Sequence, residues 1–206
     1  MVKTLESTYR PLLEAVAFAA RAHRGQLRKD GATPYASHVF RVCLVARHVF
    51  GIDDPQALTA AVLHDTVEDT TTDYDDLLKH FGAEVAGWVA LLSKDKRLPE
   101  GPREEAYRAG LKAAPWQVKV CKLADVYDNL LDGRHLSSEH RGRTLERSRS
   151  YLAVLDDPHL PEPARRAFDT VRDLLKEIAE RAVSAPGEPA ASAAGSGETT
   201  AKRNRY

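Results

Sequence analysis

The segment from Leu63 to Thr70 combines side chains that bind metal ions with side chains that transfer protons. It reads Leu63-His64-Asp65-Thr66-Val67-Glu68-Asp69-Thr70. Residues four apart share one face of a helix, so we expect His64 beside Glu68 and Asp65 beside Asp69. Imidazole and carboxylate ligands suit a divalent ion such as manganese or iron, whereas thiolate-rich sites indicate zinc. Glu68 and Asp69 could then transfer protons, although a solvated acidic helix end would contain the same residue types.

Two residues outside this segment could complete a metal site. The apolar pattern places His38 on the inner face of one expected helix and Asp125 within another. Alone, His38 would more often be a hydrogen-bonded core histidine and Asp125 a surface acid. If both converge with the His64-Asp65 pair, the four side chains form a site of two imidazoles and two carboxylates. Helical bundles build metal centres in this way, from side chains on facing helices.

Apolar residues recur at every third or fourth position, which predicts helices throughout the chain and an all-α fold. From this spacing and the capping residues, the expected helices cover about 8–24, 37–50, 55–70, 73–82, 83–93, 103–113, 116–131, 138–155 and 162–183. We expect them to form one domain over 1–183. Residues 184–206 are rich in small and polar types and lack an apolar period, which predicts a disordered tail.

Composition and charge exclude some classes of function. The 206 residues include 30 Lys and Arg against 30 Asp and Glu, so no overall field favours nucleic acid or a membrane as partner. Basic residues nevertheless gather in 21–48 and acidic ones in 62–84, and the two stretches would suit a metal-bound anion if they meet. Cys43 and Cys121 lie in apolar helical patterns, which is typical of free thiols in a reducing compartment. Without a signal peptide or a long apolar run, the sequence predicts a cytoplasmic protein and leaves its oligomeric state open.

The order of His38, His64-Asp65 and Asp125 along an all-helical chain resembles the pattern of the HD-domain phosphohydrolases. Further motifs resemble the hydrolase domain of the RelA/SpoT alarmone enzymes. They are Gly25-Gln26-Leu27-Arg28-Lys29-Asp30-Gly31, Pro34-Tyr35, the segment 63–70, Phe81-Gly82-Ala83-Glu84-Val85, and Lys122-Leu123-Ala124-Asp125 with Asn129. In size, and in the stretches 95–99 and 138–141, the chain is similar to the free-standing small alarmone hydrolases and their animal homologues.

This resemblance implies a manganese-dependent hydrolase that removes the 3′-pyrophosphate from guanosine tetra- and pentaphosphate. The animal homologues also act on the 2′-phosphate of NADPH. Carried over by position, the metal ligands would be His38, His64, Asp65 and Asp125. Glu68 and Asp69 would activate and orient the attacking water. The substrate contacts would be Arg28 and Lys29, with Arg141 on the phosphates and Asn129 on the nucleobase or sugar.

The chain departs from the family pattern at three positions that concern the substrate. The family usually has a basic residue where this chain has Val126, an Arg where it has Leu131, and, in the animal homologues, a Tyr of the nucleobase pocket where it has Leu145. All the expected metal and water residues are present. The sequence therefore leaves two alternatives open: a phosphatase acting on another nucleotide such as NADPH or an adenosine alarmone, and a non-catalytic nucleotide-binding module.

Overall fold

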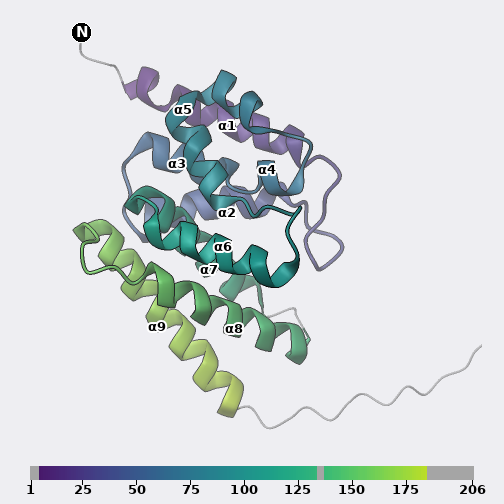
Figure 1. Ribbon diagram of the computed structural model, residues 1–206, viewed down its shortest axis with the longest axis vertical. Coiled ribbons are helices and arrows are strands. Elements are labelled where there is room, and N and C mark those ends of the chain that lie inside the picture. Colours follow the sequence, from purple (N-terminus) through teal and green to yellow (C-terminus); the bar gives the residue numbers. More distant parts are fainter. Residues whose placement is uncertain (1–4, 134–136, 185–206) are drawn as a thin grey trace, which may run out of the picture.

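The computed structural model describes residues 5–133 and 137–184, and most of them are helical (Figure 1). The elements are α1 (Leu5–Ala22), α2 (Ala36–Leu44), a π-helical turn η1 (Val45–Val49), α3 (Pro55–Leu63), α4 (Thr66–Asp69), α5 (Tyr74–Leu92), α6 (Glu100–Ala113), α7 (Trp116–Asp132), α8 (Ser138–Leu155) and α9 (Glu162–Ser184). Over the described ranges, β-type pairing is limited to an isolated bridge between Leu27 and Pro34. The all-α prediction is confirmed. The predicted disordered tail lies, beyond Ser184, outside the described residues.

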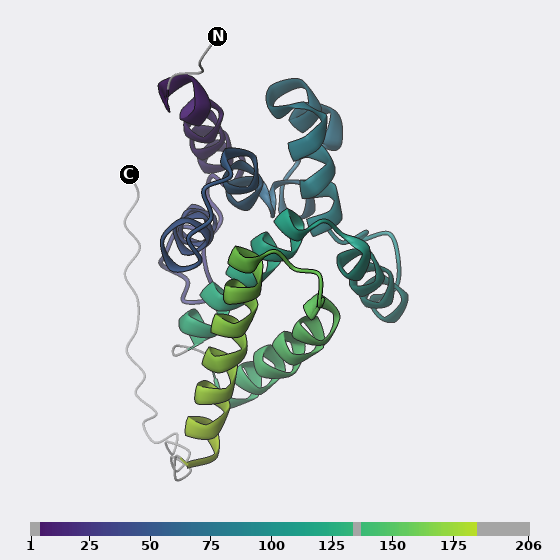
Figure 2. The same cartoon turned by 90° about the vertical axis from the view of Figure 1, so that its left-hand side faces the viewer.

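Helix α7 is the centre of the fold. Its apolar residues, among them Val118, Val120 and Leu123, are fully buried, and the helix packs against α2, α3, α5, α8 and α9. Helices α8 and α9 form a pair on one side of α7, away from α1 (Figure 2). A helix that is buried around most of its circumference can carry polar groups only where they have partners. Asp125 and Asp128 of α7 are such groups, and both are buried.

Local signals in the sequence account for the boundaries of α3 and α5. The Asp54 carboxylate accepts hydrogen bonds from the backbone amides of Gln56 and Ala57, and Pro55 occupies the first turn of α3. Asp73 and Asp76 form a capping box at the start of α5. Inside α5, Gly82 has φ 81° and ψ 169°, a conformation that favours glycine. The two helices expected on either side of Gly82 therefore form one element with a kink.

The prediction of one helix through the His64-Asp65 pair was wrong. Helix α3 ends at Leu63, and α4 begins only at Thr66. The Thr66 hydroxyl donates to the carbonyl of Leu63 at 2.7 Å, and His64 Nδ1 lies 2.9 Å from the carbonyl of Ala61. These side chains satisfy carbonyls of the last turn of α3, which lets the chain turn there. His64 and Asp65 therefore project from a break between helices.

Two other helix boundaries differ from the expected ones. The second helix ends in a π-helical turn, in which the Phe50 amide donates to the Val45 carbonyl at 3.0 Å. Helix α6 starts at Glu100 rather than near Arg103, because Pro102 in its first turn needs no backbone donor. Among the described residues, no helix is both long and apolar enough to cross a membrane.

Candidate active site

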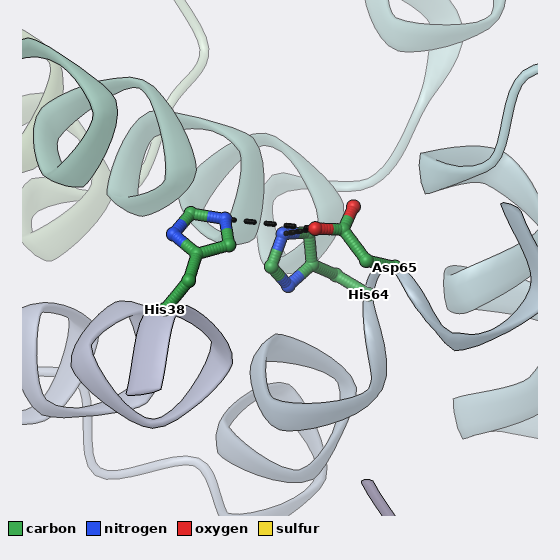
Figure 3. A group of neighbouring side chains, drawn as sticks. All are labelled: His38, His64 and Asp65. Carbon is green, nitrogen blue, oxygen red and sulfur yellow. Dashed lines mark ion pairs between the residues drawn. The ribbon is translucent and has the colours of Figure 1, made fainter. Parts of the chain in front are cut away.

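Four side chains from three parts of the chain, two imidazoles and two carboxylates, lie close together. His38 Nε2, from α2, lies 3.2 Å from Asp125 Oδ1 of α7 and 3.5 Å from Asp65 Oδ2. His64 Nε2, from the break after α3, lies 3.1 Å from Asp65 Oδ2 and 3.8 Å from Asp125 Oδ1. Figure 3 shows both imidazole rings and the Asp65 carboxylate turned toward one another. The structure thus brings together the four side chains that the sequence suggested as metal ligands.

The hydrogen bonds of the two histidines fix the tautomer of each neutral imidazole, and with it the nitrogen whose lone pair faces the cluster. His38 Nδ1 lies 2.7 Å from Asp128 Oδ2, and a carboxylate accepts, so Nδ1 carries the proton. His64 Nδ1 donates in the same way to the Ala61 carbonyl. In the neutral imidazoles both Nε2 lone pairs therefore point at the carboxylates, and His64 Nε2 is buried without a hydrogen-bond partner in the described structure.

Lone pairs facing carboxylates repel each other unless a cation lies between them. This arrangement fits a divalent metal ion, because metal-binding histidines commonly donate their second nitrogen to a carboxylate or a backbone carbonyl. Two nitrogens and two oxygens form the donor set, without a thiolate. Cys121 is buried elsewhere, with its thiol against the Ala57 carbonyl.

The pKa values reflect the same concentration of negative charge. Burial alone would lower the pKa of His64, but the carboxylates of Asp65 and Asp125 raise it to about 9. Burial likewise opposes the charged form of His38, yet hydrogen bonds to Asp125, Asp128 and Asp65 raise its pKa well above the usual value. The pKa of Asp125 is lowered despite its burial, chiefly by Lys122 and the two histidines. The cluster therefore attracts a cation strongly.

A cavity of about 260 Å³ opens beside the cluster. Its lining includes His38, Asp65, Glu68, Asp125, Arg28, Lys29, Asn129, Lys94, Lys122, Tyr107, Thr144, Arg147, Ser148 and Tyr151. Basic and acidic stretches of the sequence thus meet in one site, as the charge pattern suggested. Arg141 is exposed and does not line this cavity.

The two acids expected to handle protons have different surroundings. Glu68 lines the cavity, and its Oε2 accepts a hydrogen bond from the Lys94 amide at 2.9 Å. Burial raises the pKa of Glu68, although Lys94 opposes this shift. Asp69 does not line the cavity. Its Oδ1 pairs with Lys96 Nζ at 2.7 Å, and its Oδ2 lies 3.4 Å from the Tyr35 hydroxyl.

The expected substrate residues Arg28 and Asn129 are tied to each other and to the cluster. Arg28 donates to Asn129 Oδ1 at 3.1 Å and pairs with Asp132 at 2.7 Å. The Asn129 amide donates to Asp125 Oδ1. Lys29 lines the cavity nearby. These contacts place the basic loop between α1 and α2 directly beside the cluster of histidines and carboxylates.

Several residues of the site were missed as functional candidates. The Tyr35 hydroxyl donates to Asp65 Oδ2 at 2.6 Å, and Lys122 Nζ lies 2.7 Å from Asp125 Oδ2. The Lys122 ammonium also lies 4.4 Å from the centre of the Tyr151 ring. Tyr35 and Lys122 fall inside motifs noted above, and those motifs could have marked both residues as part of the site. The sequence does not distinguish Tyr151 as a functional residue, because it follows an ordinary apolar helical pattern.

Comparison with known proteins identifies similar chains. Residues 15–152 match the protein family described as HD domain. The human guanosine-3′,5′-bis(diphosphate) 3′-pyrophosphohydrolase MESH1 is 45% identical over 138 residues, which cover 63% of this chain and 75% of that protein. The GTP pyrophosphokinase of Streptomyces coelicolor is 34% identical over 177 residues, which cover 84% of this chain and 20% of that protein. A solved structure described as a metazoan ortholog of SpoT that hydrolyzes ppGpp superposes with a TM-score of 0.70 at 28% identity, covering 84% of this chain and 97% of that one.

Proposed function

Because this chain belongs to the HD-domain family, we propose that its buried histidine and carboxylate cluster is the centre of an alarmone hydrolase. The reaction is removal of the 3′-pyrophosphate from guanosine tetra- and pentaphosphate. The observation that carries this proposal is the convergence of His38, His64, Asp65 and Asp125 beside a cavity lined by Glu68 and basic side chains. The similarity to proteins named for this reaction supports the choice of substrate.

The metal we propose is manganese, held by His38, His64, Asp65 and Asp125. Imidazole and carboxylate donors without thiolate favour such an ion over zinc. When bound by these residues, a divalent ion would lower the pKa of a water molecule and offset the charge of phosphoryl oxygens. Asp128 and the Ala61 carbonyl hold the two imidazoles through Nδ1, which leaves each Nε2 to bind the ion.

Glu68 is the residue we propose as general base. The Lys94 amide fixes Glu68 Oε2, so Oε1 is the oxygen that accepts a proton from the attacking water. Burial raises the pKa of Glu68 toward the range in which a carboxylate is an effective base near neutral pH. Asp69 pairs with Lys96 and lies near Tyr35, so its role is to position these neighbours and not to contact the water itself. Tyr35 and Lys122 orient the carboxylates of Asp65 and Asp125.

The substrate is held by Arg28, Lys29 and Asn129 in this proposal. Asp132 and Asn129 fix the guanidinium of Arg28 at the cavity wall, which leaves its remaining donors for a substrate oxygen or base. The partner is accordingly a small nucleotide. A cytoplasmic location and the lack of a nucleic-acid partner stay predictions from the sequence.

Product analysis tests this function. The manganese-loaded protein should release pyrophosphate from guanosine-3′,5′-bis(diphosphate) and leave a plain nucleoside triphosphate intact. NADPH and the adenosine analogue belong in the same panel, because Leu145 replaces a nucleobase-pocket Tyr of the resembled family. Orthophosphate released only from NADPH would overturn the alarmone assignment. Nucleotide binding without hydrolysis of any panel member would favour the non-catalytic module.

A further inference from the structure

Among the described residues, two of the cations that line the active-site cavity form no ion pair. Arg28, Lys94 and Lys122 each have a carboxylate within 2.7 Å. Lys29 and Arg147 line the same cavity, and within the described residues the side chain of neither forms a hydrogen bond or an ion pair. Both side chains lie at the exposed rim, so their charges are available to a ligand.

The position of Arg147 follows from the register of α8. Thr144, Arg147, Ser148 and Tyr151 all line the cavity, which is the three-and-four spacing of one helix face. Arg141 and Arg149 lie on the same helix but line neither this cavity nor its neighbour. Arg147 also borders a second, more open cavity of about 570 Å³ next to α6. Arg147 therefore lines both cavities.

Lys29 and Arg147 act on each other as like charges. The pKa of Lys29 is lowered, first by burial and then by the positive charges of Arg147, Arg28 and Arg143. Arg28 is neutralised by Asp132, and Arg143 by Glu139 at 2.6 Å. The charge of Asp132 partly offsets the repulsion at Lys29, and Arg147 helps to lower the pKa of Glu104. An anion bound between Lys29 and Arg147 would relieve the repulsion that remains.

We propose that Arg147 and Lys29 together bind the phosphate group of the substrate that is not cleaved. This inference rests on the proposed function. It defines the substrate class as nucleotides with phosphate groups at both ends of the sugar, one at the metal cluster and one at the rim. Arginine suits this role because its planar fork donates two parallel hydrogen bonds to phosphate. Arg147 is then a specificity residue, and Arg141 is not.

The test compares two substrates that differ only at the remote group: guanosine-3′,5′-bis(diphosphate), and guanosine 3′-diphosphate with a free 5′-hydroxyl. Arg147→Ala should raise KM for the first substrate roughly ten- to a hundredfold, the usual range for losing hydrogen bonds to a charged group. The kcat should change much less, because the contact exists in both ground and transition states. The second substrate should be hydrolysed equally well by parent and variant. Arg147→Lys should recover part of the loss.

Arg149→Ala is the matched control, since it removes the same charge from the same helix outside both cavities, and it should behave as the parent. The inference is overturned if Arg147→Ala matches the parent on the first substrate, if it harms both substrates equally, or if Arg141→Ala shows the selective loss instead. If the parent hydrolyses neither nucleotide, the proposed function fails. Calorimetric binding of the same two nucleotides then tests the rim site by itself. Tighter binding of the doubly phosphorylated one that Arg147→Ala abolishes would then still support the rim site.

Discussion

At the scale of single residues, each candidate metal ligand is held in position by a contact with one further group. Asp128 holds His38, the Ala61 carbonyl holds His64, Tyr35 holds Asp65, and Lys122 holds Asp125. Each of these contacts is made by a residue or a carbonyl to which sequence reasoning assigned no role. The four candidate ligands could be proposed from the sequence, because metal-binding residue types stand out against an apolar pattern. Their supporting partners could not, because a tyrosine or lysine in a helix is usually explained by packing or solvation.

One prediction concerns protons displaced by the metal. In the metal-free protein the facing carboxylates raise the pKa of His64 to about 9, so its imidazole is protonated at neutral pH. Manganese needs the Nε2 lone pair, so binding must release that proton. Apparent affinity should therefore rise with pH across the neutral range toward about 9. Titration calorimetry at neutral pH, in two buffers of different ionisation enthalpy, should report at least one released proton. An affinity that does not change across the neutral range would contradict this account.

A second prediction separates metal binding from proton transfer. Glu68→Gln should retain manganese and lose turnover by about 10² to 10⁴-fold, the usual contribution of a general base. Asp69→Asn, as the comparison variant, should lose less, because Asp69 lies outside the cavity. In the parent at saturating metal, kcat should fall as pH falls through the pKa of Glu68, which burial raises above its ordinary 4.5. Parent-level turnover by metal-loaded Glu68→Gln would show that another group takes the proton.

At the scale of elements, periodicity and capping residues predicted most helices and missed the important interruption. The start of α3 at Pro55 followed from local signals, and so did the interruption at Gly82, although it proved to be a kink within one element and not the end of a helix. The break at His64-Asp65 did not, because it depends on side chains that bond to carbonyls one turn back. That break changes the geometry of the site. A continuous helix would have stacked His64 on Glu68, whereas the observed turn directs His64 and Asp65 toward α2 and α7.

The kink in α5 gives a prediction about stability. Gly82 has φ 81° and ψ 169°, a region of backbone conformation essentially restricted to glycine, so Gly82→Ala should cost about 1–3 kcal/mol of unfolding free energy. Gly87 lies in the same helix with regular backbone and open space around it. Gly87→Ala should therefore be neutral or stabilising by up to about 1 kcal/mol. Denaturant unfolding of both variants measures the difference, and equal stabilities would contradict the role given to Gly82.

At the scale of the whole molecule, equal numbers of acidic and basic residues hide an uneven distribution in space. The basic loop between α1 and α2, the acidic segment around α4 and the arginine-rich helix α8 all contribute to one cavity. The sequence showed the first two stretches as separate patches. It could not show that Arg147 rather than Arg141 would line the cavity, because this depends on how α8 is rotated against α7.

The fold class and the family were predictable because several motifs occur in a fixed order along a helical chain. The match of residues 15–152 to the HD-domain family confirms that prediction. The substrate contacts are less determined by sequence, since Val126 and Leu145 replace residues usual in the resembled family. In the structure Leu145 belongs to the buried core rather than to the cavity. The nucleobase must therefore be recognised by other groups than the one at this position.

The most direct test of the central claim measures manganese content and pyrophosphate release together. The parent should bind one manganese per chain and hydrolyse guanosine-3′,5′-bis(diphosphate). Asp125→Ala should lose both, while far-UV circular dichroism shows that the helices are retained. Asp65→Ala provides a second variant, because Asp65 is less buried than Asp125 and its loss leaves no lysine unpaired. Full manganese occupancy, or hydrolysis at the parent rate, in either folded variant would contradict the assignment of this cluster as the catalytic metal centre.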